Sequence, residues 1–208
     1  MRILVVAATE FEIEPFTRDN NIAEVLIAGV GITGTVYNLT KTLFQNKYDL
    51  VIQAGIAGTF NKTYSNGDVV VVSEDTFGDA GIEEKNNFHT LFETGFAAEN
   101  DLPYTGGWLL NGNPVLETVL LPKAKAITVN MVTDNKERIA RIAEKFNPDV
   151  ESMEGAAFHY VCLREKVNFL QIRSISNEVG ERDKTKWAIA NAIANLNIEL
   201  KKAVQNFN

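Results

Sequence analysis

The sequence predicts an α/β fold built on a central sheet. Short runs of β-branched and other apolar residues alternate along the chain with longer stretches in which apolar residues recur at helical spacing. Several of these runs are continuously apolar, a pattern typical of strands that are buried on both faces of a sheet. Alternation of such strands with helices favours helices packed on a shared sheet.

Six apolar runs are the expected strands. In chain order they are Ile3–Val6, Val25–Ile27, Leu50–Ile52, Val69–Val72, Ile127–Val129 and Phe169–Ile172. Each is short and rich in β-branched, leucine or aromatic side chains, which pack well on a pleated surface.

Four longer stretches are the expected helices: Thr33–Asn46, Asp134–Phe146, Glu154–Lys166 and Asp183–Asn206. In the first of them Val36, Leu39, Leu43 and Phe44 recur at helical spacing. Trp187 is expected in the core, as part of the last helix. Residues 78–126 are less regular, and we expect loops, a short helix and a mobile cover over a site there.

Composition and charge limit the classes of function. The chain has 208 residues, of which 45% are hydrophobic and 23% charged, so we expect one folded domain spanning residues 1–208. A net charge of −7 argues against a nucleic-acid partner or an anionic membrane surface, because both attract clustered Lys and Arg. The single cysteine, Cys162, excludes an internal disulfide, and the first apolar run is shorter than that of a signal peptide. We therefore expect a cytoplasmic protein.

Gly29, Gly31 and Gly34 form the pattern G-x-G-x-x-G, which is the outline of a dinucleotide-binding loop. In a dinucleotide site, an acidic residue at the end of the second strand binds the ribose. Asp49 has the right separation but precedes the strand that starts at Leu50, so we expect its carboxylate at the wrong edge of the sheet. A tight strand-to-helix turn is the simpler interpretation.

Two further segments follow expected strands. QAGIAG at residues 53–58 is expected to form a second glycine turn, and RSISNEVGERD at 173–183 a polar loop in which Asp183 caps the last helix. Because ligands bind at the carboxyl edge of open α/β sheets, two neighbouring glycine turns favour a pocket at that edge.

Acidic residues also follow expected strands. Thr9 and Glu12 match a capping box, in which the two residues exchange hydrogen bonds with each other's backbone. Glu151 and Glu154 flank Ser-Met just before a helix that opens with small residues. Close packing of those small residues should partly enclose Glu154, and sugar hydroxyls are suitable partners for an enclosed carboxylate.

Five segments, in order, resemble the nucleoside phosphorylase-type family of purine nucleosidases and phosphorylases. They are ILVVAATEFEIEPF, VLIAGVGITGTVYNL, VIQAGIAGTF, GDVVVVSEDTFGDAG and VESMEGAAFHYV followed by IRSISNEVGERD. The pairs Met153-Glu154 and Ser176-Asn177 are the most specific, and the last segments are most similar to the futalosine hydrolase branch. The resemblance implies a three-layer α/β/α fold around a mixed, partly barrel-like sheet, and cleavage of a purine N-glycosidic bond.

The resemblance also implies roles for individual residues. Glu12 is expected to activate an attacking water, Glu154 to accept from the ribose hydroxyls, and Met153 to lie against the sugar. The other expected substrate-binding residues are Gly31, Gly55, Met131, Val132, Ser176, Phe77 and Arg182, of which Arg182 is to meet the 5′ carboxylate of the substrate and Phe77 the base.

Gln53 stands where the phosphorylase branch typically has an arginine that binds phosphate. A neutral amide cannot pair with an oxyanion as a guanidinium does, so Gln53 favours water as the nucleophile and predicts a hydrolase. The alternatives are a methylthioadenosine/adenosylhomocysteine-type nucleosidase, a phosphate-dependent purine nucleoside phosphorylase, and a non-catalytic nucleotide-binding protein that uses the glycine loop.

Asn177 is expected to be catalytic and to select the base. The adenine-releasing branch has an aspartate at this position, whereas an amide offers N–H donors to both O6 and N7 of a 6-oxopurine such as hypoxanthine. We expect no cofactor and no metal, because no His, Cys and Asp cluster has ligand spacing. His159 is read as a packed helical histidine, and the family implies a homo-oligomer, dimeric or larger.

Overall fold

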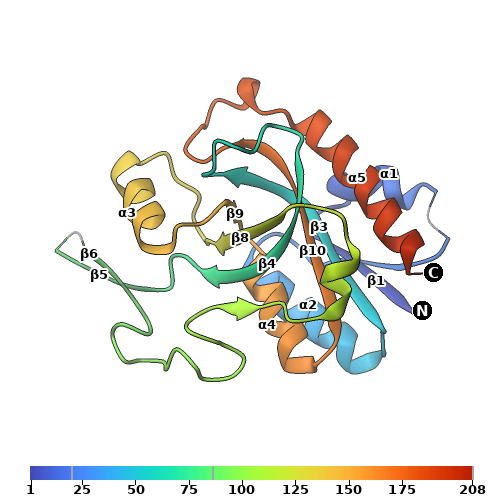
Figure 1. Ribbon diagram of the computed structural model, residues 1–208, viewed down its shortest axis with the longest axis horizontal. Coiled ribbons are helices and arrows are strands. Elements are labelled where there is room, and N and C mark those ends of the chain that lie inside the picture. Colours follow the sequence, from blue (N-terminus) through green and yellow to red (C-terminus); the bar gives the residue numbers. More distant parts are fainter. Residues whose placement is uncertain (20, 86, 208) are drawn as a thin grey trace.

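A computed structural model describes residues 1–19, 21–85 and 87–207 (Figure 1). In chain order its elements are β1 (Ile3–Ala7), α1 (Glu10–Thr17), β2 (Glu24–Ile27), α2 (Ile32–Gln45), β3 (Leu50–Thr59), β4 (Val69–Phe77), β5 (Gly81–Glu84), β6 (Asn87–Thr90), β7 (Leu109–Leu110), the 3-10 helix η1 (Pro114–Thr118), β8 (Lys123–Thr128), α3 (Lys136–Phe146), β9 (Val150–Ser152), α4 (Gly155–Glu165), β10 (Asn168–Glu178), the 3-10 helix η2 (Lys184–Lys186) and α5 (Ile189–Asn206).

The central sheet is mixed and partly closed. In the described part of the chain it has eight strands in the order β10-β4-β8-β9-β3-β1-β2, with β7 paired to β4. Because β10 also pairs with β3, the strands β3, β10, β4, β8 and β9 close into a barrel. β1 and β2 continue the sheet as parallel strands from the first half of β3. The expected mixed, partly barrel-like sheet is confirmed.

Helices cover the sheet on two faces, which gives the three layers (Figure 1). Ile3 and Val5 of β1 belong to the hydrophobic cluster that α1 and α5 help to form, whereas Leu4 and Val6 belong to the cluster formed with α2 and α4. Alternate residues of a strand face opposite sides of a sheet, so a strand covered on both sides must be apolar throughout. This explains the continuous apolar runs.

β3 and β10 are longer than the sequence predicts. The segment QAGIAG lies inside β3 and the segment RSISNE inside β10, so the expected turn and the first half of the expected loop are strand instead. Both segments contain glycine or polar residues because they border a cavity and a buried polar cluster, and apolar patterning therefore stops before the strands do. The register shifts between Ile175 and Asn177, which pair with the consecutive residues Ala57 and Gly58, so Ser176 is the extra residue of a β-bulge.

The C-terminal helix is shorter than expected. α5 begins at Ile189, and Asp183 instead caps η2 by accepting from the Thr185 backbone N–H at 3.0 Å. Trp187 lies between the two helices, is half-buried, and lines the cavity described below, so its expected place in the core was wrong.

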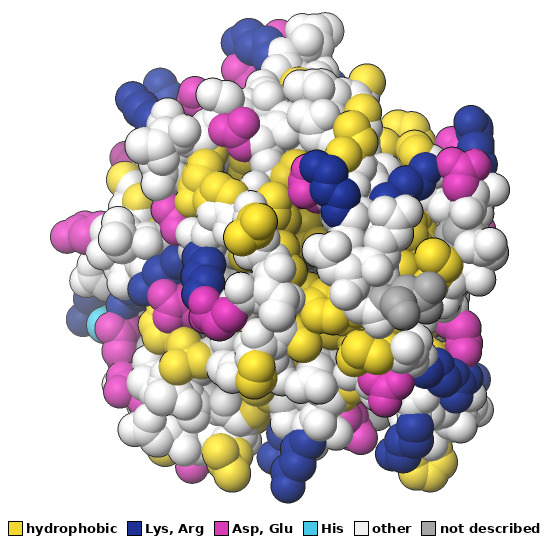
Figure 2. Space-filling model, turned by 45° about the vertical axis from the view of Figure 1, so that its right-hand side comes forward, with side chains coloured by type: hydrophobic (Ala, Val, Ile, Leu, Met, Phe, Trp, Pro, Cys, Tyr) yellow, Lys and Arg dark blue, Asp and Glu magenta, His cyan; other side chains and the backbone are white. Residues whose placement is uncertain are grey.

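Residues 78–126 contain the β5–β6 hairpin, β7 and η1, which matches the expected loops and short helix (Figure 1). On the face shown in Figure 2, acidic and basic side chains are interspersed, with patches of hydrophobic side chains between them. Within the described residues, no helix combines the length and the hydropathy that crossing a bilayer requires.

Candidate active site

A cavity of about 580 Å³ opens at the ends of β1, β3, β9 and β10. Among the residues expected in the site, those that line it are Glu12, Val132, Met153, Glu154, Ser176, Asn177 and Arg182. They come from segments that are far apart in the sequence, and the closed sheet brings them together at one place. None of the described residues of 78–126 lines the cavity, so that segment does not cover it within this chain.

Glu12 is held at the edge of the cavity by hydrogen bonds from the start of α1 and from β3. Its Oε2 accepts from the Thr9 backbone N–H at 3.1 Å and from the Thr9 hydroxyl at 3.0 Å, and its Oε1 accepts from the Ile56 N–H at 3.2 Å. The expected capping box is therefore present. The same contacts fix both carboxylate oxygens of a buried side chain at the edge of the cavity.

Glu154 is held by a backbone donor and a buried cation. Its Oε1 accepts from the Gly31 N–H at 2.9 Å, and its Oε2 lies 3.8 Å from Arg173 Nη1. The Arg173 guanidinium also donates to Gln53 Oε1 at 2.8 Å. Gln53 is thus buried and turned toward an arginine of its own chain rather than toward the cavity.

Arg173 was not singled out from the sequence. It is the largest of the fully buried side chains and lies beneath Glu12 and Glu154, because a Cβ added at Gly55 would contact both its guanidinium and Glu12 Oε1. The signal that could have found it is a charge in the middle of an apolar strand, LQIRSIS, where burial requires a buried partner.

The glycine loop serves Glu154 rather than a dinucleotide. Gly29 and Gly31 have φ values of +86° and +87°, and this backbone points the Gly31 N–H at Glu154. Gly34 packs on the Ala28 carbonyl, where a side chain would clash. Asp49 accepts from the Arg2 backbone N–H at 2.7 Å, at the start of β3 and at the end away from the cavity. This placement disfavours the dinucleotide interpretation.

Ser176 fixes the orientation of the Asn177 amide. The Ser176 hydroxyl donates to Asn177 Oδ1 at 2.8 Å, so the Asn177 NH₂ group points the other way. One of its two N–H donors bonds the Glu178 carbonyl at 2.7 Å, which leaves the second for a ligand. The sequence predicts that both donors serve the base, and in this structure one of them is already engaged.

Four expected contacts do not line the cavity. Gly31 and Gly55 lie behind it, where they pack against Glu154 and Arg173, and the other two, Phe77 and Met131, lie elsewhere. Phe77 lines a separate cavity with Phe92, Tyr104 and Trp108, because it ends β4 on the side covered by the 90–108 segment. Met131 is 56% exposed and does not line the large cavity, although its neighbour Val132 does. Neither side chain is in place to contact a base in this structure.

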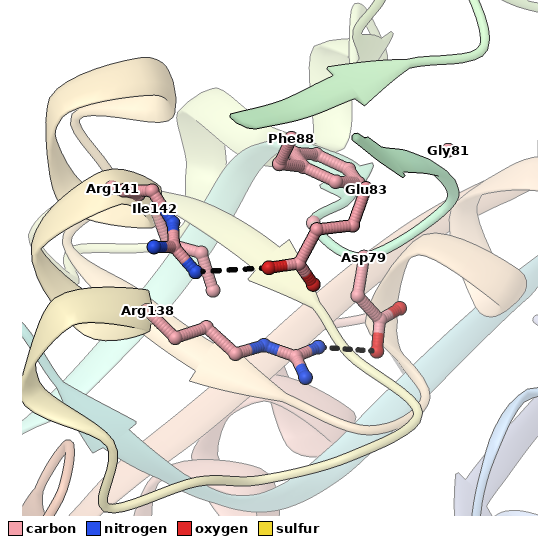
Figure 3. Close-up of a pocket in the computed structure, with 8 residues that line it drawn as sticks. Asp79, Gly81, Glu83, Phe88, Arg138, Arg141 and Ile142 are labelled. Atoms are coloured by element: carbon pink, nitrogen blue, oxygen red, sulfur yellow. Dashed lines mark hydrogen bonds and ion pairs between the residues drawn. The ribbon is translucent and has the colours of Figure 1, made fainter. Parts of the chain in front are cut away.

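Ion pairs that line a small cavity between α3 and the β5–β6 hairpin help to hold the segment around Met131 (Figure 3). Arg138 of α3 lies 3.6 Å from Asp79, and Arg141 lies 3.3 Å from Glu83. Asp79 in turn accepts from the backbone N–H groups of Asn130 and Met131, at 2.8 and 3.3 Å. These ion pairs therefore anchor the strand end that leads to Val132.

Among the further residues that line the cavity are Glu151, Lys184 and Trp187, which the sequence analysis did not assign to the site. Trp187 Nε1 donates to the Glu181 carbonyl at 2.9 Å, and its ring lies 5.4 Å from the Arg182 guanidinium carbon. Arg182 lies near enough to Glu151 to oppose the rise that burial causes in the pKa of that acid.

A buried polar cluster lies behind the site. Burial raises the pKa of Asp75 to about 7, although Gln171 and Thr128 donate to its carboxylate. Burial lowers the pKa of His159 to about 4, and its Nδ1 lies 2.9 Å from the Leu109 carbonyl. His159 is the packed histidine that the sequence predicts. Within the described residues, no group of three His, Cys, Asp or Glu side chains gathers as metal ligands do.

Comparison with known proteins agrees with this geometry. The phosphorylase superfamily profile matches residues 21–205. The chain belongs to the phosphorylase superfamily. Within this superfamily it is 28% identical to a futalosine hydrolase of Thermus thermophilus over 82% of this chain and 76% of the relative, and 31% identical to a futalosine hydrolase of Streptomyces coelicolor over 83% and 74%.

The superfamily fold is also found in solved structures. A methylthioadenosine/S-adenosylhomocysteine nucleosidase of Colwellia psychrerythraea, solved with adenine, superposes with a TM-score of 0.82 at 18% identity, over 99% of this chain and 95% of that one. At this identity the likeness concerns the fold, and it agrees with the three layers and the closed sheet described above.

Proposed function

We propose that this superfamily member hydrolyses the N-glycosidic bond of futalosine, releasing hypoxanthine and dehypoxanthine futalosine in the futalosine route of menaquinone biosynthesis. The observation that carries the proposal is one cavity lined by two buried glutamates, Glu12 and Glu154, and by the outward-facing amide of Asn177. The two relatives named futalosine hydrolase support it.

The two glutamates have different roles at the sugar. Glu12 takes a proton from the attacking water through Oε1, which accepts from the Ile56 N–H and keeps a second lone pair. Glu154 accepts from the ribose hydroxyls, and its negative charge lies near the oxocarbenium ion that forms as the bond breaks. The Gly31 N–H and Arg173 keep this carboxylate in place before substrate arrives.

Asn177 acts on the departing base. Charge that leaves the glycosidic bond spreads onto N7 and O6 of hypoxanthine, and an N–H donor at this edge stabilises it. Rotation of the amide away from the Glu178 carbonyl would free the second donor for the same edge. The Ser176 hydroxyl, which holds Oδ1, keeps the donors rather than the acceptor facing the cavity.

Water rather than phosphate is the proposed nucleophile. Among the described residues, the cationic side chains that line the cavity are Arg182 and Lys184, both from the segment that follows β10. Gln53 and Arg173 bind each other beneath the cavity, so neither lines the end that Glu12 occupies. An oxyanion would therefore meet the Glu12 carboxylate there without a lining cation to neutralise it.

The deciding experiment identifies the freed base. Purified protein is incubated with futalosine, inosine and methylthioadenosine, with and without phosphate, and the products are separated by chromatography. We expect hypoxanthine from futalosine at a rate that phosphate does not change. Faster release of adenine from methylthioadenosine would instead assign a nucleosidase of that type, and a requirement for phosphate would assign a phosphorylase.

The carboxylate at the 5′ end of futalosine needs a cation. The sequence assigns this role to Arg182, but Arg182 lies near Glu151, and Lys184 lines the same cavity. Arg182→Ala and Lys184→Ala separate the two: the variant that loses the contact has a raised KM for futalosine and an unchanged KM for inosine. Equal losses on both substrates, in both variants, would reject a 5′ role for either residue.

We also propose that the chain works as a homo-oligomer in the cytoplasm. Tyr37 and Phe44 lie two turns apart on α2 and are 65% and 86% exposed, as is typical of a helix face that packs on another copy. The buried, unpaired Cys162 suits a reducing compartment. Light scattering should give at least twice the monomer mass, and a monomer mass would reject the assembly.

A further inference from the structure

Glu151 is a buried acid that lines the cavity. It is 7% exposed, and within the described residues its carboxylate makes no side-chain hydrogen bond and no ion pair within 4.0 Å. Burial and Asp79 raise its pKa to about 7, against the lowering effects of Arg138 and Arg182. Arg138 is itself paired with Asp79 (Figure 3). Buried carboxylates are normally hydrogen-bonded, so one that faces a cavity without a partner points to a ligand that supplies a donor.

The strand register places Glu151 across from Asn177. Gly58 of β3 pairs with Glu151 of β9 on one side and with Asn177 of β10 on the other. Val150, the neighbour of Glu151, packs inside the barrel, so Glu151 faces the opposite way, toward the cavity. The Cα atoms of Glu151 and Asn177 are therefore two strand spacings apart, about 9–10 Å.

Gly58 and Val179 line the cavity between these two side chains. A Cβ built on Gly58 would lie 3.0 Å from Val179 Cγ2 and 3.4 Å from Asn177 Nδ2, so both side chains lean over the glycine. This part of the cavity therefore has an apolar surface at Val179, an amide donor at Asn177 and a carboxylate acceptor at Glu151. The polar edge of a flat ring that packs on Val179 can face both polar groups.

The two polar groups match the edge of a 6-oxopurine. Hypoxanthine offers acceptors at N7 and O6 and a donor at N1–H, whereas adenine offers a 6-amino donor and an acceptor at N1. At pH 8, where the specificity is tested, the pH lies above the pKa of about 7 and the Glu151 carboxylate is ionised. An ionised carboxylate only accepts, so it can bond N1–H of hypoxanthine and is repelled by N1 of adenine. Building on the proposed function, we infer that Glu151 accepts from N1–H of the base and, with Asn177, determines the preference for a 6-oxopurine.

The preference should be large because the penalty falls on buried groups. A site built around a substrate donor rejects an analogue that lacks it, since the carboxylate is then left unpaired in a dry cavity. Glu151 bonds N1–H both before and during bond breaking, so its loss should raise KM more than it lowers kcat.

The test compares, at pH 8, futalosine with its 6-amino analogue, which differ only at this edge. For the wild type we expect kcat/KM to favour futalosine, and in Glu151→Gln we expect the ratio of the two kcat/KM values to fall by at least about tenfold, because an amide can turn a donor toward N1 of adenine. Glu144→Gln, an exposed change on α3, is the control and should keep the wild-type ratio.

A second probe needs no variant. Futalosine methylated at N1 has lost the donor, so the wild type should cleave it at least about tenfold less efficiently than futalosine. A wild-type ratio retained by Glu151→Gln, or full activity on the N1-methyl substrate, would overturn the role of Glu151 while leaving the hydrolase intact. If the wild type releases no hypoxanthine from futalosine, the proposed function itself is wrong, and the role of Glu151 is rejected with it.

Discussion

Gly55→Ala tests the packing that holds Glu12 and Glu154, the two glutamates to which we assign roles at the sugar. A Cβ at this position would contact Arg173 Nη1 more closely than side chains tolerate and would lie 3.1 Å from Glu12 Oε1. Arg173 has no free direction in which to retreat, because it is fully buried, donates to Gln53 at 2.8 Å and lies 3.8 Å from Glu154. The added methyl group should therefore displace the guanidinium from its partners.

The expected cost follows from these contacts. Overpacking a well-packed interior costs about 1–3 kcal/mol, and losing a hydrogen bond that involves a charged group costs about 1.5–3 kcal/mol. Partial relaxation keeps the sum near 3 kcal/mol, which corresponds to a loss of roughly 6–12 °C in Tm for a chain of this size. Because Glu154 loses its cation and Glu12 is pushed, we expect kcat/KM to fall by about 10–100-fold.

Thermal unfolding followed by circular dichroism, together with the futalosine assay, measures both effects. Gly112→Ala is the matched control, because a Cβ at that exposed glycine has no heavy atom within 4 Å and its φ is not positive. It should stay within about 0.5 kcal/mol of the wild type. If Gly55→Ala unfolds and turns over as Gly112→Ala does, Arg173 does not support the site in the way argued here.

Further changes probe the chemistry and the buried cluster. Glu12→Gln should lower kcat by about 10²–10⁴-fold with little change in KM, whereas the exposed Glu10→Gln should be active; equal activity of the two in a futalosine assay would remove Glu12 as the base. Asn177→Asp should lower kcat/KM for futalosine by about 100-fold at pH 8, because an ionised carboxylate offers no donor to O6 and N7, and undiminished turnover would contradict the role of the amide. Asp75→Asn removes a group whose pKa is raised from 3.8 to about 7, so its stability relative to the wild type should rise as pH rises from 4 to 7. His159→Gln removes a group whose pKa is lowered from 6.5 to about 4, so its stability relative to the wild type should fall as pH rises from 4 to 6.5. Urea unfolding of the wild type and both variants at several pH values measures these two differences, in which the raised pKa of Glu151 cancels, and differences of the same sign would show that the two groups do not titrate as described.

Apolar patterns in the sequence predict the alternating strands and helices of the central sheet, whereas the three layers and the partly closed barrel were implied by the family resemblance. Runs such as Ile3–Val6 are apolar throughout since helices cover both faces of the sheet, and this apolar pattern can be recognised from the sequence alone. The second halves of β3 and β10 are not visible, because there the side chains face a cavity and a buried polar cluster. Polar residues and glycines in a strand resemble a loop when the neighbouring strands are unknown.

The sequence predicted the site residues that belong to sequence motifs and missed those whose position depends on burial or on strand pairing. Glu12, Glu154 and Asn177 lie in segments that match sequence motifs of the family, and the structure brings them to one cavity. Arg173 acts through burial beneath other residues, and Glu151 through strand pairing with Gly58. Neither relation can be read from one sequence, because each depends on which strands become neighbours.

The bulge at Ser176 separates the position of the Asn177 side chain from the packing of the hydrophobic core. Ile175 is fully buried inside the barrel, and in a regular strand every later position would be tied to the same inside-outside alternation. The extra residue interrupts this alternation, so a new side chain at position 177 need not fit into space that the core already fills. A substitution at this strand tip can therefore change the chemical group that lines the cavity without remodelling the barrel that supports it.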